Sequence, residues 1–169
     1  PMTALNPVHS IGQQVAECIR LHRGVGQGQA WALAGDALSR VGLPASRVPP
    51  ERYPHELSGG QRQRVVIAMA VALGPRLLIA DEPTTALDVT TQAGILDLLK
   101  ELMREHDMAL MLISHDLAVV ADIADSVVIM RRGRIVEQGP RESVFADLHH
   151  PYTRQLFEAS SHVPERRVS

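Results

Sequence analysis

The 169-residue sequence has very little cysteine, lysine and aromatic side chain. Its one cysteine, Cys18, cannot form a disulfide within the chain or a thiolate cage for a metal, which favours a reducing compartment. No window approaches the roughly 18 consecutive apolar residues that a membrane-spanning helix needs, so the sequence predicts none. The formal net charge is −2, which gives no support for nucleic-acid binding. Disulfide-stapled, membrane-spanning and strongly polycationic proteins are therefore excluded.

Lysine occurs once, at Lys100, against sixteen arginines. Leu99 and not glycine precedes it, so these residues contain no G-x4-G-K-[ST] loop for binding phosphates. The sequence also opens with Pro1-Met2 and not with an initiator methionine. We therefore expect the chain to be a piece of a longer protein, and we expect it to be inactive by itself in chemistry that needs such a loop.

What is present is typical of a folded protein, with 45% hydrophobic and 21% charged residues. Apolar residues at helical spacing predict four helices of ordinary length and a short one. These are 8–22, 29–41, 58–73, 90–105 and, for the short helix, 117–123.

Short apolar runs bounded by turns or charges predict strands at 77–80, 109–113 and 127–130, the first of them buried. Arg132-Gly133 predicts a turn into a further strand at 134–138, which makes an antiparallel hairpin. The segment 43–57 holds four prolines and is expected to be irregular.

Strands that alternate with helices predict an α/β fold with a parallel β core, preceded by an all-helical stretch. We expect a helical subdomain over residues 1–60 and the α/β core over 58–159. The polar segment 160–169 is expected to be a frayed tail.

The segment 57–64, Leu-Ser-Gly-Gly-Gln-Arg-Gln-Arg, places two glycines where a helix begins. Ser58 is a good N-cap, and Gly59 and Gly60 let an anion approach the amides at the positive end of the helix dipole. The segment therefore predicts a phosphate site, although an ordinary turn before a helix has the same composition. Arg62 and Arg64 could contact phosphate, but a basic pair on a solvated helix face is the favoured interpretation.

Two adjacent carboxylates, Asp81 and Glu82, follow the predicted strand 77–80, at the sheet edge where α/β folds usually bind ligands. Asp81 suits Mg²⁺ held through its water shell, and Glu82 suits polarising a water for attack on phosphorus. His115 follows the next strand and is expected to point at the same rim. The alternatives are an acidic pair that caps a strand and a structural histidine.

In combination, these segments resemble the ATP-binding subunit of ATP-binding cassette (ABC) transporters. Residues 57–61 match the family's LSGGQ signature, 77–82 its Walker B strand with the catalytic glutamate, 86–88 its D-loop, and His115 its switch histidine. The resemblance implies a P-loop NTPase-like fold and a partial cassette, since the family's Walker A loop is absent from these residues.

The segments 81–90, 1–7 and 150–153 resemble the dipeptide and oligopeptide importer branch, which includes nickel and microcin-type systems. The resemblance covers about residues 1–159. It implies an ATP-hydrolysing subunit, with Glu82 and His115 as catalytic residues and with Mg²⁺ at Asp81. It further implies that ATP contacts a group of residues made up of Ser58, Gly59, Gly60, Gln61 and Asp88.

The resemblance also implies partners. Two cassettes meet head to tail, so that each signature helix serves the other chain's ATP, and they bind transmembrane permease subunits and, indirectly, a solute-binding protein. The implied location is peripheral, on the cytoplasmic face of a bacterial inner membrane. Two alternatives stay open: a soluble cassette ATPase that acts on DNA or ribosomes, and an interaction fragment that hydrolyses nothing.

Overall fold

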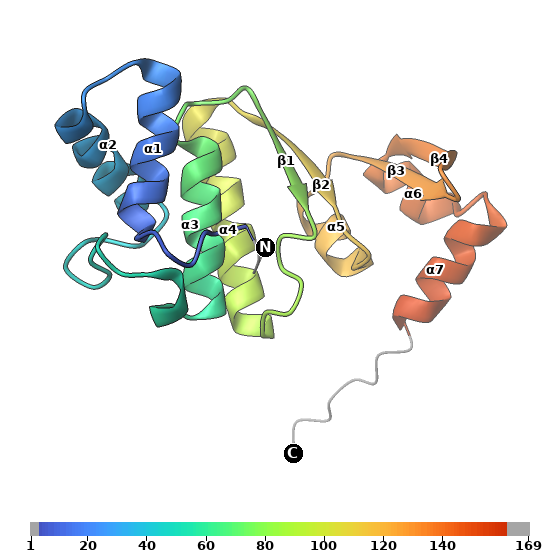
Figure 1. The fold of residues 1–169 in the computed structure, drawn as a ribbon. Helices are drawn as coiled ribbons and strands as arrows, with labels where there is room; N and C mark the ends of the chain where they lie inside the picture. Colours follow the sequence, from blue (N-terminus) through green and yellow to red (C-terminus); the bar gives the residue numbers. More distant parts are fainter. Residues whose placement is uncertain (1–3, 162–169) are drawn as a thin grey trace. The chain divides into compact units, whose positions relative to one another are not determined.

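The computed structural model describes residues 4–161. The opening 1–3 and, from the tail expected to fray, residues 162–169 lie outside the described residues. Contacts divide the chain into an N-terminal unit that ends at Met111 and a C-terminal unit that begins at Leu112 (Figure 1). Among the described residues, we find no helix whose length and apolar character would let it cross a membrane.

Helices and short strands alternate after a helical beginning, which confirms the predicted α/β class. The elements up to residue 113 are α1 (Ile11–Arg23), α2 (Gln27–Arg40), the 3-10 turn η1 (Pro54–Glu56), α3 (Gly59–Val71), β1 (Leu77–Asp81), α4 (Val89–His106) and β2 (Ala109–Ile113). They are followed by α5 (Leu117–Ile123), β3 (Ser126–Arg131), β4 (Arg134–Pro140), α6 (Arg141–Asp147) and α7 (Pro151–Ser161). The sequence patterns predict all of these except η1, α6 and α7.

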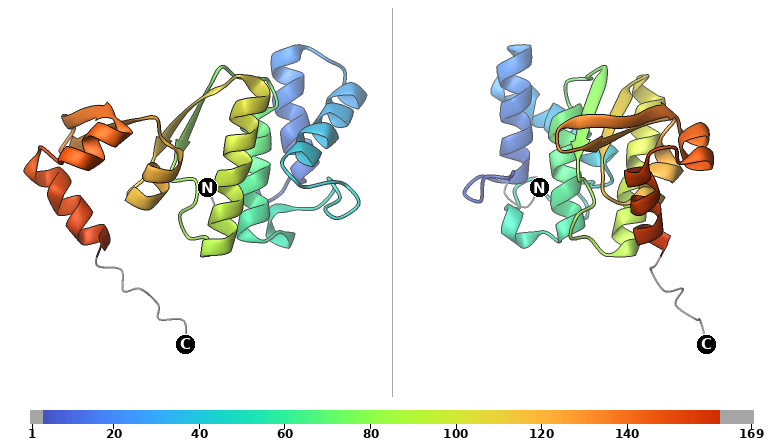
Figure 2. Two further views of the ribbon diagram at one scale, coloured as in Figure 1. Left: turned by 180° about the vertical axis from the view of Figure 1, so that it is seen from behind. Right: turned by 90° about the vertical axis from the view of Figure 1, so that its right-hand side faces the viewer.

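Four helices make the core of the N-terminal unit. Helix α1 packs on α2, both contact α3, and α3 contacts α4. Both Figure 1 and Figure 2 show α3 and α4 running side by side. Their inward faces bury branched apolar side chains such as Ile19, Val65 and Leu99 at helical spacing, and this burial stabilises the unit.

The proline-containing segment before α3 is fixed against α1. The amides of Ile11 and Gly12, which have no acceptor within the helix, donate to the carbonyls of Arg52 and Pro50, both at 2.8 Å. A Cβ on Gly12 would lie 2.7 Å from Cβ of Pro50, so only glycine allows this close approach. Helix α1 begins at Ile11 and not at residue 8, because Ser10 caps it.

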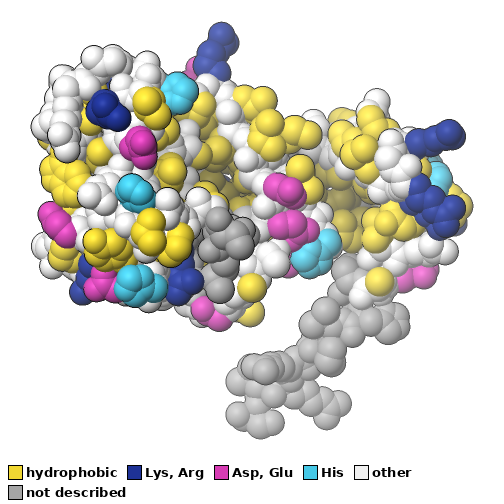
Figure 3. Space-filling view, viewed as in Figure 1, with side chains coloured by type: hydrophobic (Ala, Val, Ile, Leu, Met, Phe, Trp, Pro, Cys, Tyr) yellow, Lys and Arg dark blue, Asp and Glu magenta, His cyan; other side chains and the backbone are white. Residues whose placement is uncertain are grey.

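Strands β1 and β2 are neighbours in a two-stranded parallel sheet. The expectation that β1 is a buried strand is only half right. Leu78 is buried, whereas Leu77 and Ile79 are 51% and 60% exposed, since alternate residues of a strand point to opposite faces. Figure 3 shows hydrophobic side chains open to solvent over these strands. One face of β1 is thus left uncovered among the described residues.

In the C-terminal unit, β3 and β4 form the predicted antiparallel hairpin. Arg132 and Gly133 both have positive φ, as a type I′ turn requires. One extra residue on β4 shifts the register after Ile129. Val127 and Ile129 of β3 bury one face of the hairpin against Val144 of α6, and this cluster is the unit's core.

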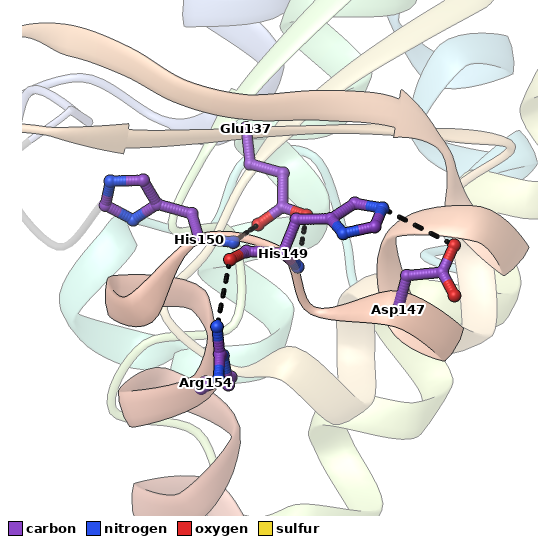
Figure 4. A network of polar contacts seen from close by, with 5 residues as sticks. All are labelled: Glu137, Asp147, His149, His150 and Arg154. Carbon is purple, nitrogen blue, oxygen red and sulfur yellow. Dashed lines mark hydrogen bonds and ion pairs between the residues drawn. The ribbon is translucent and has the colours of Figure 1, made fainter.

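The carboxylate of Glu137 on β4 ties the start of α7 to the hairpin (Figure 4). It accepts hydrogen bonds from the amides of His149 and His150, at 3.0 and 3.1 Å, and from the hydroxyl of Thr153, which is fully buried. These donors, Thr153 foremost, hold the pKa of Glu137 below its ordinary value, because they favour the charged form. The carboxylate therefore satisfies amides that α7 leaves unpaired.

We expect Glu137→Gln to weaken the docking of α7, because an amide offers one acceptor oxygen where the carboxylate offers two. A depressed pKa contributes stability above the ordinary value of 4.5, and that contribution is lost as the pH falls through the lower, folded-state pKa. The difference in free energy of unfolding between wild type and variant should therefore be largest near neutral pH and shrink in acid. Chemical denaturation at several pH values measures it, with the exposed Glu142→Gln as control. A pH-independent difference would contradict this account.

Candidate functional site

The signature segment forms the first turn of α3 with a reciprocal cap. Ser58 Oγ accepts from the amide of Gln61 at 3.3 Å, and Gln61 Oε1 accepts from the amide of Ser58 at 3.0 Å. This capping box confirms the predicted N-cap, and it places the amides of Gly59 and Gly60, both half-buried residues, in the first turn of the helix. The side chain of Gln61 thus shapes the turn, a role that the S-x-x-Q spacing of the sequence signals.

The two glycines of this turn also face the start of α4. A Cβ on Gly60 would overlap the Cγ2 methyl of Thr91, and one on Gly59 would lie 3.4 Å from Cδ2 of Leu87. Gly60 is thus required by the packing of α3 on α4, a reason that is independent of any anion. The structure brings the signature turn together with residues 87–91 of the same chain.

Asp81 and Glu82 stand at the end of β1, as the sequence predicts. The Asp81 side chain is exposed, and Glu82 is half-buried. Glu82 has φ of 50°, in the left-handed region that non-glycine residues rarely adopt. The hydroxyl of Thr85 donates to its carboxylate at 2.6 Å. This bond and the unusual backbone fix the direction of the carboxylate, a role of Thr85 that the sequence analysis missed.

Asp88 is the N-cap of α4. One carboxylate oxygen accepts from the amide of Thr91 at 2.9 Å and the other from its hydroxyl at 2.6 Å. The hydroxyl bond is the main reason that the pKa of Asp88 lies below its ordinary value. The side chain is nonetheless exposed, so it can face a ligand or a partner. Sequence analysis missed this role of Thr91.

His115 lies in the loop between β2 and α5, in the C-terminal unit, and it is exposed. The loop around it is ordered by local bonds. Ser114 Oγ accepts from the amide of Asp116 at 3.0 Å, and Asp116 caps α5. That His115 points at the same rim as Asp81 stays a prediction, since Asp81 belongs to the N-terminal unit.

The expected solvated role of Arg64 is wrong. Its guanidinium donates to the carbonyls of Val41, at 2.8 Å, and Gly94, at 3.2 Å, and so joins the end of α2 to α4. Arg62 donates through Nε to the carbonyl of Leu57 at 3.0 Å. Lys100 lies inside α4, far along the chain from the signature turn, in a helix and not in a phosphate-binding loop.

The carboxylates suit a metal only in part. Within residues 4–161, no group of three or more His, Cys, Asp or Glu side chains is placed to hold an ion. Mg²⁺ usually takes one or two protein carboxylates and completes its octahedron with phosphate oxygens and water. Asp81, exposed at a strand end, therefore fits an ion that arrives with a nucleotide.

Comparison with known proteins identifies this arrangement. The sequence profile described as "ABC transporter" matches residues 3–85. A Brucella melitensis biotype 1 protein, named as a peptide import ATP-binding protein, is 54% identical over 159 residues, which are 94% of this chain and 47% of that protein. The chain belongs to the ABC transporter family.

Further relatives agree with this family. The glutathione import ATP-binding protein GsiA of Salmonella typhimurium is 54% identical over 94% of this chain and 26% of GsiA. A solved structure, the inward-facing conformation of a metal-chelate type ABC transporter, has a TM-score of 0.75 at 27% identity and covers 85% of this chain and 57% of that chain. The present ABC chain spans about half the length of the Brucella relative, and about a quarter of GsiA.

We expect Gly60→Ala to destabilise the protein by about 1–3 kcal/mol, the usual cost of overpacking, because its Cβ would overlap the methyl of Thr91. The second substitution Thr91→Ser removes that methyl and leaves Thr91 Cβ at 3.8 Å, an ordinary contact, so the double variant should recover most of the loss. Gly59→Ala is the matched control and should be tolerated. Thermal unfolding measures all three, and no recovery in the double variant would refute the packing explanation.

Proposed function

We propose that this chain supplies the signature turn and the catalytic carboxylate of an ABC-type ATPase, which hydrolyses ATP to drive the import of peptides or related small solutes. The observation that carries the proposal is the packing of the capped Ser58–Gly60 turn within the same chain. This turn contacts the end of the segment that connects Asp81 and Glu82 to Asp88. The relatives are named as a peptide and a glutathione import ATP-binding protein, which supports the choice of solute class.

In this proposal, Ser58 and the amides of Gly59 and Gly60 bind the γ-phosphate of ATP, because a helix start offers unpaired donors and a positive dipole. Gln61 contributes through the cap. Asp88 faces the same composite site.

The remaining roles concern hydrolysis. Asp81 would hold Mg²⁺ through its water shell, and the ion would neutralise phosphate charge. Glu82, oriented by Thr85, polarises the attacking water, and His115 positions it.

The signature turn holds no nucleotide of its own chain in this proposal. Two cassettes pair head to tail, and each signature serves the ATP of the other. The helical part, residues 1–60, transmits the closure of the pair to transmembrane permease subunits, which in turn receive solute from a solute-binding protein. This places the subunit on the cytoplasmic face of a bacterial inner membrane.

Two other functions share the same motifs. A cassette ATPase that acts on DNA or ribosomes would co-purify with DNA or ribosomes and not with a permease. A fragment that only binds a partner would show no saturable heat with millimolar Mg-ATP in calorimetry. This chain by itself is expected to give the same result, so the two functions are distinguished by ATP hydrolysis in a full-length cassette that contains this sequence. The net charge of −2 and the import relatives favour the transport subunit.

The proposal is tested by Glu82→Gln in a full-length cassette that contains this sequence. The amide keeps the shape and accepts the Thr85 hydroxyl but lacks basicity, so the rate of ATP hydrolysis should fall by about 100-fold or more while ATP-driven dimerisation persists. Glu101→Gln, the same change on the exposed face of α4, should leave the rate unaltered. If Glu82→Gln hydrolyses ATP at the parent rate, the base lies elsewhere.

The head-to-tail arrangement has its own test, in a mixed dimer of one Gly59→Asp subunit and one subunit with a defective Walker A loop. Gly59 is chosen because its Cβ has room, whereas a side chain at Gly60 disturbs α4. The added carboxylate repels phosphate. If the signature acts on the partner's ATP, both lesions fall in one site and the other site still occludes nucleotide. Loss of occlusion at both sites would instead mean that each signature serves its own chain.

A further inference from the structure

Thr91 contacts two motifs that the proposed function uses separately. Its hydroxyl donates to one carboxylate oxygen of Asp88 at 2.6 Å, and its amide donates to the other oxygen at 2.9 Å. Its Cγ2 methyl lies where a side chain on Gly60 would be. A single half-buried side chain therefore joins the D-loop carboxylate to the backbone of the signature turn.

This contact restricts how Asp88 is oriented. An exposed aspartate ordinarily samples several rotamers, but here both oxygens are engaged by the same residue. That residue is itself packed against the first turn of α3 through its methyl. The carboxylate is consequently fixed relative to Ser58–Gly60 and not only relative to its own helix.

We propose that Thr91 is a positioning residue of the composite nucleotide site, whose hydroxyl aims the Asp88 carboxylate and whose methyl keeps that carboxylate in register with the signature turn. The inference rests on the proposed function, since it takes Asp88 to act at that site. The methyl contributes packing, and the hydroxyl contributes the orientation on which hydrolysis depends. The lowered pKa of Asp88 agrees with this geometry, because a donor aimed at the carboxylate favours the ionised form.

The test compares Thr91→Val and Thr91→Ser in a full-length cassette that contains this sequence. Valine keeps the Cγ2 methyl and the amide cap but replaces the hydroxyl by a second methyl, so hydrolysis should fall about two- to tenfold, as expected for one lost hydrogen bond, with only a small fall in melting temperature. Serine keeps the hydroxyl and should retain most of the rate. Thr90→Val, the same change at the exposed neighbouring residue, is the matched control.

A double-variant cycle separates positioning from general stability. Asp88→Ser keeps a short side chain that can cap α4 but removes the carboxylate. If Thr91 acts through Asp88, Thr91→Val should cause no further loss in the Asp88→Ser background. The inference would be overturned if Thr91→Val lowered the rate of hydrolysis by the same factor in both backgrounds. It would also be overturned if Thr91→Val hydrolysed ATP at the wild-type rate, or if Thr91→Ser lost as much activity as Thr91→Val.

One measurement does not depend on hydrolysis. The pKa of the Asp88 carboxyl, followed by NMR titration, should rise in Thr91→Val and stay in place in Thr91→Ser. A parent cassette that hydrolyses no ATP would refute the proposed function, while the titration would still decide whether Thr91 holds Asp88. An unmoved pKa in Thr91→Val would refute the inference, whatever the activity of the parent.

Discussion

The close packing of α3 on α4 at their first turns is the contact on which the geometry of the candidate site depends. Because Gly60 has no side chain, the start of α3 can lie directly against Thr91. Further along α3, the guanidinium of Arg64 donates to the carbonyl of Gly94 and fixes the same two helices again. Both helix starts are capped by their own side chains, so each presents a rigid end. A displacement of the signature turn must therefore also displace the D-loop of the same chain.

The segment between β1 and α4 is strained, and its two anchored ends explain why the strain persists. Glu82 and Ala86 both have positive φ, each at a cost of roughly 1–3 kcal/mol for a residue other than glycine. Leu78 is buried in β1 on one side, and α4 is held on α3 on the other. The hydroxyl of Thr85 adds a bond to Glu82 inside the segment. Such pre-set geometry suits a carboxylate that must hold a water in one orientation, as the proposed function of Glu82 requires.

The local chemistry of the chain was readable from sequence, and its tertiary contacts were not. The cap at Ser58 follows from short-range spacing, and helical periodicity predicted the main helices to within a few residues, whereas the cap at Asp88 was found only in the structure. Periodicity cannot tell which atoms approach a glycine, so the packing reason for Gly60 was missed, as was the bridging role of Arg64. Helices α6 and α7 were missed as well, although the 11 residues of α7 are enough to carry a periodic signal. An apolar run likewise predicts a strand without saying how many of its faces are covered.

Exposed strand residues show where the stability of the two units comes from. Leu77 and Ile79 on β1, and Val128 and Met130 on β3, are more than half exposed, so these strands bury one face only. Burial contributes roughly 25 cal/mol per Å² of apolar surface, and a strand with one open face gains about half of what a strand covered on both faces gains. The helices of the N-terminal unit, by contrast, bury complete apolar stripes. The helical packing that places the signature turn against Thr91 therefore buries more apolar surface than the strand that carries Asp81.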